Sequence, residues 1–247
     1  MKFGLIGHPI EHSLSPALFK AGYDGLYPYE LIETSDFEEA YSSFLKEYDG
    51  INVTAPFKEL ALKKADIISE ECRMIGATNL LVKTADGVKA YNSDYLGVRR
   101  WLTEIGKGME VQPRVLIVGM GGAGKAAAAA AKSSGYETVL MNRTQYSPEI
   151  RPLSEFCNEF QKADVIIYNL PVKIPQIDQL SEADLSAGNG KTILEANYRH
   201  PEFNLIHENI RYMDGKEWLL LQAVTGYEIF TGQTPDYESM KAVIKSK

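Results

Sequence analysis

The sequence predicts an α/β protein with two domains. The first observation is the stretch Arg114–Ala131, in which an apolar run, Val115–Val118, leads into a glycine-rich turn and then into a run of alanines. The second is that strand-length apolar runs alternate with helix-length amphipathic segments, as in a sheet covered by helices. The third is that this stretch lies in the middle of the 247 residues, which leaves the segment before it to form a separate unit.

The turn after the apolar run has the spacing of a dinucleotide-binding site. A strand, Gly119-x-Gly121-x-x-Gly124 and the start of a helix follow one another as in the first βαβ unit of a Rossmann-type domain. Gly119 permits the tight turn, Gly121 lets the backbone approach a pyrophosphate, and Gly124 lets the helix pack against the strand. The free N–H groups and positive dipole end of the helix would then face the phosphates. We therefore expect residues 98–221 to form a nucleotide-binding domain.

The next strand of that domain indicates which cofactor binds. Thr138–Met141 is a predicted strand, and Asn142-Arg143-Thr144 follows it. Enzymes that use NAD usually place an acid at this strand end for the ribose 2′-hydroxyl, whereas an arginine accommodates the 2′-phosphate of NADP. Because Arg143 is present and an acid is absent there, we expect NADP, the alternative being that Arg143 is merely exposed. A later predicted strand, Ala163–Tyr168, ends at Asn169.

The chain before the glycine turn is predicted to form an α/β domain that holds the substrate. Phe3–Ile6 is its first predicted strand, and a loop then leads to a helix with Ser15 as the N-cap and Pro16 as the first residue. Ser13 and Ser15 would thus lie at a helix start, which suits a carboxylate. Capping alone is the alternative explanation for these serines.

A later strand carries polar side chains on one face and ends close to a lysine. Asn52 and Thr54 alternate with apolar neighbours, and Lys58 follows just beyond the strand end. Ligands of open α/β sheets bind beyond the carboxyl ends of the strands. Lys58 is therefore a candidate for the chemistry, although a single lysine is more often a solvated surface charge.

Further elements follow from the same rules. A capping-box pattern at Ser35 predicts a helix start, and periodicity predicts helices over 60–68 and 70–75. Asp86-Gly87, between two apolar runs, is typical of a hairpin turn. Near the end of the chain, Gln222 lies within an apolar helical face, either as a satisfied polar group of the core or as a ligand contact.

Composition excludes several classes of function. The formal net charge is −7, which argues against nucleic acid as a partner because phosphate binding needs a basic surface. Two cysteines are too few for a disulfide framework or a cysteine-built zinc site, and we expect no metal. An apolar run of membrane-spanning length and a signal peptide are both absent from the sequence, so we expect a cytoplasmic protein without a membrane partner.

Taken together, these motifs resemble those of the shikimate dehydrogenase family over nearly the whole chain. His12-Ser-Leu-Ser-Pro16 is similar to the family's serine motif, which implies that Ser13 and Ser15 hold the substrate carboxylate. Asn52-Val-Thr-Ala-Pro-Phe-Lys58 is similar to its most diagnostic motif, which implies Asn52 and Thr54 as substrate contacts and Lys58 as the catalytic lysine. Gly76-Ala-Thr-Asn79 and Asn92-Ser-Asp94 resemble the segments that bind substrate hydroxyls through Asn79 and Asp94.

The second half of the chain resembles the same family. Gly119-x-Gly-Gly122 and Asn142-Arg-Thr144 are similar to its NADP motifs. The resemblance implies that the segment around Gln222 returns to the first domain and contacts substrate, so that residues 1–97 and 222–247 form one domain. The remaining implied contacts are Tyr198 to substrate and, to the cofactor, Gly119, Gly121, Gly122, Ala123, Asn142, Arg143, Thr144 and Asn169.

The implied activity is NADPH-dependent, reversible reduction of 3-dehydroshikimate to shikimate in chorismate biosynthesis, by a monomer or homodimer. The chain departs from the family pattern where Gln145-Tyr-Ser-Pro148 replaces a second basic residue, and Trp218 stands where a methionine is usual. Two alternatives are open. One is a quinate/shikimate dehydrogenase that prefers NAD, disfavoured by Arg143. The other is a non-catalytic NADPH-binding regulatory protein on the same fold, disfavoured by Lys58 and Asp94.

Overall fold

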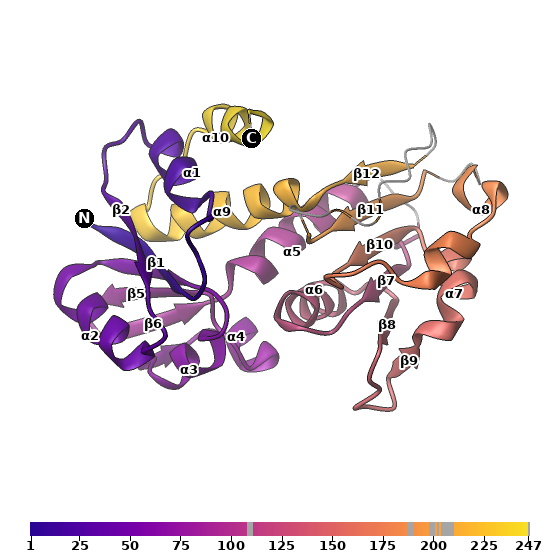
Figure 1. The fold of residues 1–247 in the computed structure, drawn as a ribbon, viewed down its shortest axis with the longest axis horizontal. Coiled ribbons are helices and arrows are strands. Elements are labelled where there is room, and N and C mark those ends of the chain that lie inside the picture. Colours follow the sequence, from indigo (N-terminus) through magenta and orange to yellow (C-terminus); the bar gives the residue numbers. More distant parts are fainter. Residues whose placement is uncertain (108–110, 187–189, 198–200, 202, 204–209, 247) are drawn as a thin grey trace. The chain divides into compact units, whose positions relative to one another are not determined.

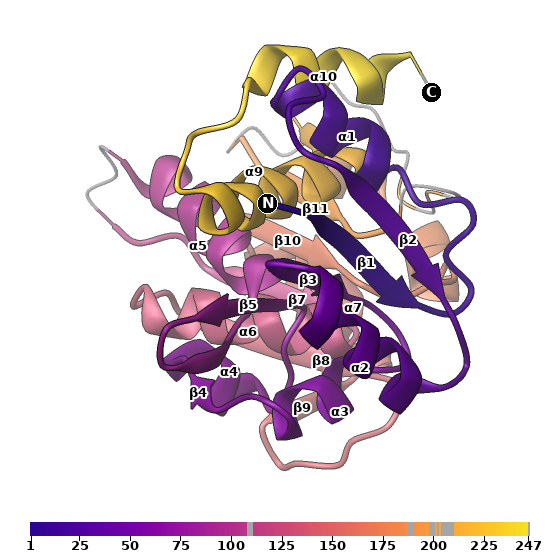
Figure 2. The same ribbon diagram turned by 90° about the vertical axis from the view of Figure 1, so that its left-hand side faces the viewer.

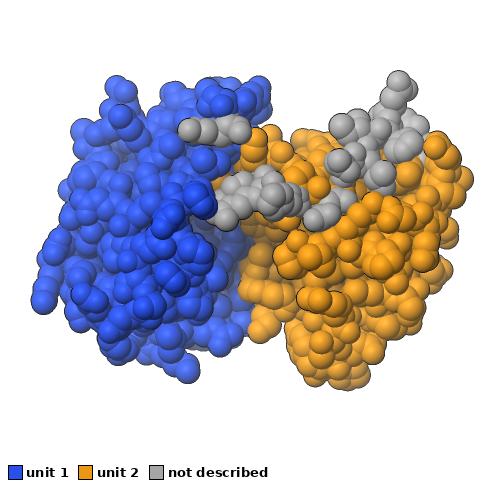
Figure 3. Space-filling view, viewed as in Figure 1, with its two compact units in different colours: residues 1–97, 220–247 blue, residues 98–219 orange. Residues whose placement is uncertain are grey.

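A computed structural model describes residues 1–107, 111–186, 190–197, 201, 203 and 210–246 (Figure 1). It separates into two compact units, Met1–Gly97 with Leu220–Lys247, and Val98–Leu219 (Figure 3). The helices α5 (Ser93–Gly106) and α9 (Gly215–Thr231) each contain a boundary between the units. The boundary expected at 221/222 lies two residues further along α9 than the observed one at 219/220.

The first unit is built on a mixed sheet with the strand order β2-β1-β3-β5-β6-β4. Parallel pairs join β1 to β2 and β3, and β4 to β6, whereas β5 runs antiparallel to β3 and β6. The strands are β1 (Phe3–Gly7), β2 (Tyr29–Glu33), β3 (Gly50–Val53), β4 (Ile67–Ile68), β5 (Leu80–Thr84) and β6 (Gly87–Tyr91). The β5–β6 pair confirms the hairpin predicted at Asp86-Gly87.

Helices cover both faces of this sheet because its strands are apolar on both sides. Along β1, Ile6 packs in one core with Phe44 of α2, whereas Phe3 stacks on Phe230 of α9 with ring centroids 4.8 Å apart. The C-terminal α10 lies beside α1 (Figures 1 and 2). The helices of this unit are α1 (Ser15–Gly22), α2 (Phe37–Glu47), α3 (Lys58–Lys63), α4 (Glu70–Ile75), α10 (Tyr237–Lys245) and parts of α5 and α9.

Three local predictions in this unit are wrong. Helix α1 begins at Ser15 itself, with Leu14 as its N-cap, and Ser15 is not the capping residue. Helix α2 is capped by Asp36, whose carboxylate accepts from two backbone N–H groups, rather than by Ser35. The helix expected over 60–68 ends at Lys63, and Ile67–Ile68 instead pairs with β6 as a strand.

The second unit is a parallel sheet with the order β12-β11-β10-β7-β8-β9. The chain starts in the middle at β7, moves outward to β9, and returns to β10 on the other side, which is the Rossmann arrangement. Its strands are β7 (Val115–Val118), β8 (Thr138–Asn142), β9 (Ile150–Pro152), β10 (Val165–Tyr168), β11 (Thr192–Glu195) and β12 (Arg211–Met213). The neighbouring strands β7 and β10 mark the point where the strand order reverses, which is where such sheets bind ligands.

The alanine run explains how the first helix of this unit packs. Helix α6 (Gly122–Ser133) buries Ala126, Ala127, Ala130 and Ala131 completely, since small side chains let it lie close to the sheet. The other helices are α7 (Phe156–Lys162), α8 (Glu182–Ser186) and the 3₁₀ segments η1 (Leu153–Glu155) and η2 (Pro175–Gln179). Among the described residues, none of the helices combines the length and the apolar character that crossing a membrane requires.

Candidate active site

The topology of the first sheet brings polar residues together at the carboxyl end of β3. Because β5 runs antiparallel to β3, with Asn52 opposite Leu80, the residue before β5, Asn79, lies beside the carboxyl end of β3. Tyr91 at the end of β6 also pairs with Leu80, which brings Asp94 to the same edge. Lys58, the first residue of α3, follows β3 directly. The expected site residues from β3, β5 and β6 are therefore neighbours.

Lys58 and Asp94 form an ion pair at this edge. The Lys58 ammonium donates to Asp94 Oδ2 over 2.8 Å, and the Asn79 side-chain amide donates to the same oxygen over 3.0 Å. The side chain of Asp94 is 10% exposed and that of Lys58 is 24% exposed. The carboxylate is thus held by two donors, while the ammonium still reaches solvent or a ligand. Such a cation can stabilise negative charge on an oxygen and give it a proton.

A buried serine connects this pair to the C-terminal helix. The backbone N–H of Ser93 donates to Asn79 Oδ1 over 2.7 Å, and Ser93 Oγ lies 3.0 Å from Oε1 of Gln222. Ser93 is completely buried. The structure therefore brings Gln222 into the network of Lys58 and Asp94. Sequence reasoning did not select Ser93, and its only signal was its place between two residues of the Asn92-Ser-Asp94 motif.

A second branch of the network leads towards the serine motif. The Tyr29 hydroxyl donates to Asn52 Oδ1 over 2.8 Å, and the Asn52 amide donates to the carbonyl of Asn79 over 3.3 Å. Tyr29 packs edge-on against Tyr227, with ring centroids 6.0 Å apart, and Tyr227 in turn contacts the backbone of Ser15. Tyr29 and Tyr227 were not predicted from the sequence, because neither lies in one of the motifs that indicated the site.

The tyrosine hydroxyls remain neutral in this setting. Burial raises the pKa of Tyr29 and that of Tyr227 well above the ordinary value. The Tyr227 hydroxyl also donates to the backbone carbonyl of Ser15 over 3.0 Å. Ser13 Oγ accepts from the backbone N–H of Ser15, the first residue of α1, over 3.2 Å. Thr54 follows β3 and is half-buried.

The glycine turn of the second unit leaves room for a phosphate group. Gly119 has φ +93°, a conformation that favours glycine, and a Cβ on Gly124 would lie 1.8 Å from the Gly119 carbonyl oxygen. These two glycines are therefore required by the turn itself. Gly121 and Gly122 are exposed, and a Cβ on either would meet only open space. The free N-terminus of the 12-residue helix α6 begins at this point, which fits a pyrophosphate.

The strand ends on either side of the turn carry the other expected cofactor residues. Asn142 Oδ1 accepts from the backbone N–H of Met120, and its amide donates to the carbonyl of Thr144, so Asn142 ties the glycine turn to the loop after β8. Arg143 and Thr144 are exposed. In the described part of the chain, Arg143 has no carboxylate partner, which leaves its charge available for an anion.

Asn169 lies at the end of β10, beside the glycine turn. Its backbone N–H donates to the Val118 carbonyl over 2.7 Å, and its side-chain Oδ1 is buried without a hydrogen-bond partner among the described residues. A buried acceptor without a partner is costly, so a donor from a ligand would stabilise it. Ala123, at the start of α6, is half-buried. These residues fit a dinucleotide, whereas the expected substrate contact Tyr198 lies outside the described residues.

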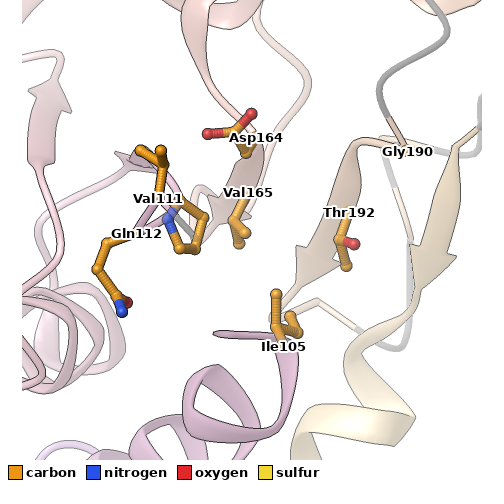
Figure 4. Close-up of a pocket in the computed structure, with 8 residues that line it drawn as sticks. Ile105, Val111, Gln112, Asp164, Val165, Gly190 and Thr192 are labelled. Carbon is orange, nitrogen blue, oxygen red and sulfur yellow. The ribbon is translucent and has the colours of Figure 1, made fainter. Parts of the chain in front are cut away.

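A separate pocket of about 230 Å³ lies at the amino ends of the strands of the second sheet, whereas the glycine turn lies at their carboxyl ends (Figure 4). Asp164, Val165 and Thr192 line it at the amino ends of β10 and β11, away from the glycine turn. Asp164 already accepts from the backbone N–H of Arg114 over 2.8 Å.

Among the residues that the structure describes, there is no group of three or more His, Cys, Asp or Glu side chains that could hold a metal ion.

Comparison with known proteins gives consistent matches. Residues 5–81 match the model of the shikimate dehydrogenase substrate binding domain. The chain is 30% identical over 260 residues to the shikimate dehydrogenase (NADP(+)) of Pyrococcus abyssi, covering 98% of this chain and 96% of that protein. It is 28% identical over 280 residues to the pentafunctional AROM polypeptide of Candida tropicalis, covering 99% of this chain but 18% of that polypeptide.

A solved structure extends the likeness to three dimensions. The fold resembles the crystal structure of shikimate 5-dehydrogenase from Thermus thermophilus in complex with NADP(H) and shikimate, with a TM-score of 0.79 and 25% sequence identity. The match covers 100% of this chain and 99% of that chain. Both units of the present fold therefore have counterparts in a single solved enzyme.

Proposed function

The chain belongs to the shikimate dehydrogenase family, and we propose that it catalyses the reversible, NADP-dependent reduction of 3-dehydroshikimate to shikimate. The observation that carries this proposal is the Lys58–Asp94 pair, held by Asn79 at the carboxyl ends of the strands. The same chain has an intact glycine turn and an arginine at the end of β8. A binding protein without catalysis would have no need for a positioned proton donor.

Lys58 is the proposed acid of the reaction. NADPH, when bound, supplies the hydride that reduces the substrate carbonyl. Lys58 stabilises the negative charge that then develops on the carbonyl oxygen and gives that oxygen a proton. In the oxidation of shikimate, the same nitrogen receives the proton from the hydroxyl. Asp94 holds the ammonium at 2.8 Å, and Asn79 fixes the carboxylate.

The remaining polar residues of the first unit suit a substrate with one carboxylate and several hydroxyls. We assign the carboxylate to Ser13 and Ser15, near the hydroxyls of Tyr29 and Tyr227, which stay neutral and so do not repel an anion. The ring hydroxyls are assigned to Asp94 and to the neutral side chains Asn52, Thr54, Asn79, Gln222 and Tyr198.

The cofactor residues are assigned on the second unit. Gly119, Gly121, Gly122 and Ala123 would hold the pyrophosphate at the start of α6, where Gly121 and Gly122 face open space and Gly119 shapes the turn. Arg143 and Thr144 would bind the 2′-phosphate, with Asn142 fixing the loop that carries them. Asn169 would offer its unpartnered Oδ1 to the cofactor.

Steady-state kinetics with four substrate pairs tests this proposal. The purified protein is assayed with shikimate or quinate and with NADP or NAD, and kcat/KM is compared. We expect the highest value for shikimate with NADP. A higher value with quinate and NAD would support the quinate/shikimate alternative, and NADPH binding without turnover would support a regulatory protein. We further propose that the enzyme is cytoplasmic. We also propose that it is a monomer or a homodimer, and light scattering would determine which of the two it is.

A further inference from the structure

Resting on the proposed function, we infer that Tyr227 is a positioning residue that holds the serine motif, His12–Pro16, in place for the substrate carboxylate. The Tyr227 hydroxyl donates to the backbone carbonyl of Ser15 over 3.0 Å, although the two residues are 212 positions apart in the sequence. Tyr227 is 1% exposed, so it acts through Ser15 rather than on the substrate itself. Because burial raises the pKa of Tyr227, its hydroxyl keeps the proton for this bond at neutral pH.

The loop that carries the serine motif is tied down at both of its ends. At its start, the backbone N–H of His8 donates over 3.1 Å to the carbonyl of Ala55, which lies just beyond β3. Inside the motif, Ser13 Oγ accepts from the backbone N–H of Ser15 over 3.2 Å. At the end of the loop, the Ser15 carbonyl accepts from Tyr227. The first and the last of these bonds together set where the two serines lie relative to the carboxyl end of β3.

Helix α9 gives the Tyr227 hydroxyl a firm support. A Cβ on Gly97 of α5 would lie 2.9 Å from the backbone nitrogen of Gln222 in α9, and a Cβ on Gly226 of α9 would lie 3.2 Å from Ser93 Cβ. All of these residues belong to the first unit, and the two glycines let the backbones of α5 and α9 touch. Since Tyr227 follows Gly226 directly, its bond to the serine motif fixes that motif relative to the hydrogen-bond network around Ser93.

Replacing Tyr227 by Phe removes the hydroxyl and keeps the ring. The ring packs edge-on against Phe19 of α1, with centroids 4.7 Å apart, and stacks on Phe230 at 6.4 Å, and phenylalanine can make both contacts. We expect Tyr227→Phe to raise the KM for shikimate by about 3- to 10-fold, the range of one neutral hydrogen bond. The kcat and the KM for NADP should change less, because the carboxylate is bound equally in the ground state and the transition state.

Tyr23→Phe is the matched control, because it removes another buried hydroxyl that joins the same two helices. Tyr23 follows α1 directly, at the end away from the serine motif, and its hydroxyl donates to the backbone carbonyl of Tyr227 over 2.8 Å. Tyr23→Phe should lower the melting temperature and leave the KM for shikimate unchanged. Equal rises in KM for the two variants would show a general loosening of α1 against α9 and would overturn the inference.

A mutant cycle with the two serines tests whether Tyr227 acts through them. The double variant Ser13→Ala with Ser15→Ala lacks the hydroxyls assigned to the carboxylate but keeps the Ser15 carbonyl. Adding Tyr227→Phe to it should leave the KM for shikimate nearly unchanged. If the effects multiply instead, Tyr227 acts on the substrate by a route other than the serines, and the inference is wrong.

Hydrogen exchange in the protein without ligands measures the same bond independently of any substrate. The backbone N–H of Ser13 donates to the Ile10 carbonyl over 2.9 Å, and in NMR spectra it should exchange about 3- to 10-fold faster in Tyr227→Phe than in wild type. In Tyr23→Phe it should change less. An unchanged rate in Tyr227→Phe would refute the inference. A wild type without activity on shikimate would refute the proposed function instead, and the exchange rates would still decide whether Tyr227 holds the serine motif.

Discussion

The Lys58–Asp94 pair can be tested by removing each charge and then both. Lys58→Met removes the ammonium at similar side-chain length, and Asp94→Asn removes the carboxylate charge at the same size. At 2.8 Å, two unit charges attract by roughly 6 kcal/mol at an effective dielectric constant of about 20, before the cost of desolvation is subtracted. Each single substitution removes this attraction, so the two single variants and the double variant together show whether the charges act on turnover as a pair.

The expected loss follows from the role of Lys58 as acid. General acid catalysis contributes about 10²–10⁴-fold, so Lys58→Met should lower kcat by that factor, equivalent to about 2.7–5.5 kcal/mol of transition-state stabilisation. Asp94→Asn should also lower kcat, because Lys58 loses its anchor. If Asp94 acts on turnover through Lys58, the double variant should have about the same kcat as Lys58→Met alone.

The assay is the absorbance of NADPH at saturating substrate, with circular dichroism melts to show that each variant is folded. A folded Lys58→Met variant with a kcat within about threefold of wild type would exclude Lys58 as the acid. A double variant whose loss equals the product of the two single losses would show that Asp94 contributes to turnover independently of Lys58.

Three further experiments test the cofactor site and the fold. Arg143→Ala should raise the KM for NADP far more than that for NAD, and an equal rise would show that Arg143 does not bind the 2′-phosphate. Gly124→Ala should lower the melting temperature without cofactor, since its Cβ would lie 1.8 Å from the Gly119 oxygen, whereas Gly122→Ala, facing open space, should not. The Ser239 backbone N–H and hydroxyl lower the pKa of Asp236 below its ordinary value, so its carboxylate stabilises the fold at neutral pH and loses this effect as pH falls through the folded-state pKa. The difference in melting temperature between wild type and Asp236→Ala should therefore shrink in acid, and a constant difference would contradict this.

Local patterns were sufficient wherever one short segment determines its own structure. The run from Val115 through Gly124 predicts a strand, a turn and a helix because only glycine tolerates the backbone at Gly119 and the contact at Gly124. Asp86-Gly87 predicted the hairpin in the same way. The N-cap of α1, by contrast, is Leu14 rather than Ser15, because the helix start depends on the preceding loop, in which the Ser13 N–H donates to the Ile10 carbonyl and Ser13 Oγ accepts from the Ser15 N–H.

Pairing between distant segments was decided by the tertiary structure alone. Ile67–Ile68 has the pattern of a helix end but becomes a strand because the edge of β6 accepts it. In the candidate site, too, the sequence predicted one part and the tertiary structure decided the other. Its residue types were predicted by motif, but the contact of Ser93 with Gln222 joins positions 129 residues apart. That contact exists because Gly97 and Gly226 let two helices touch, and a sequence read along the chain contains no spacing rule for two helices that meet in space.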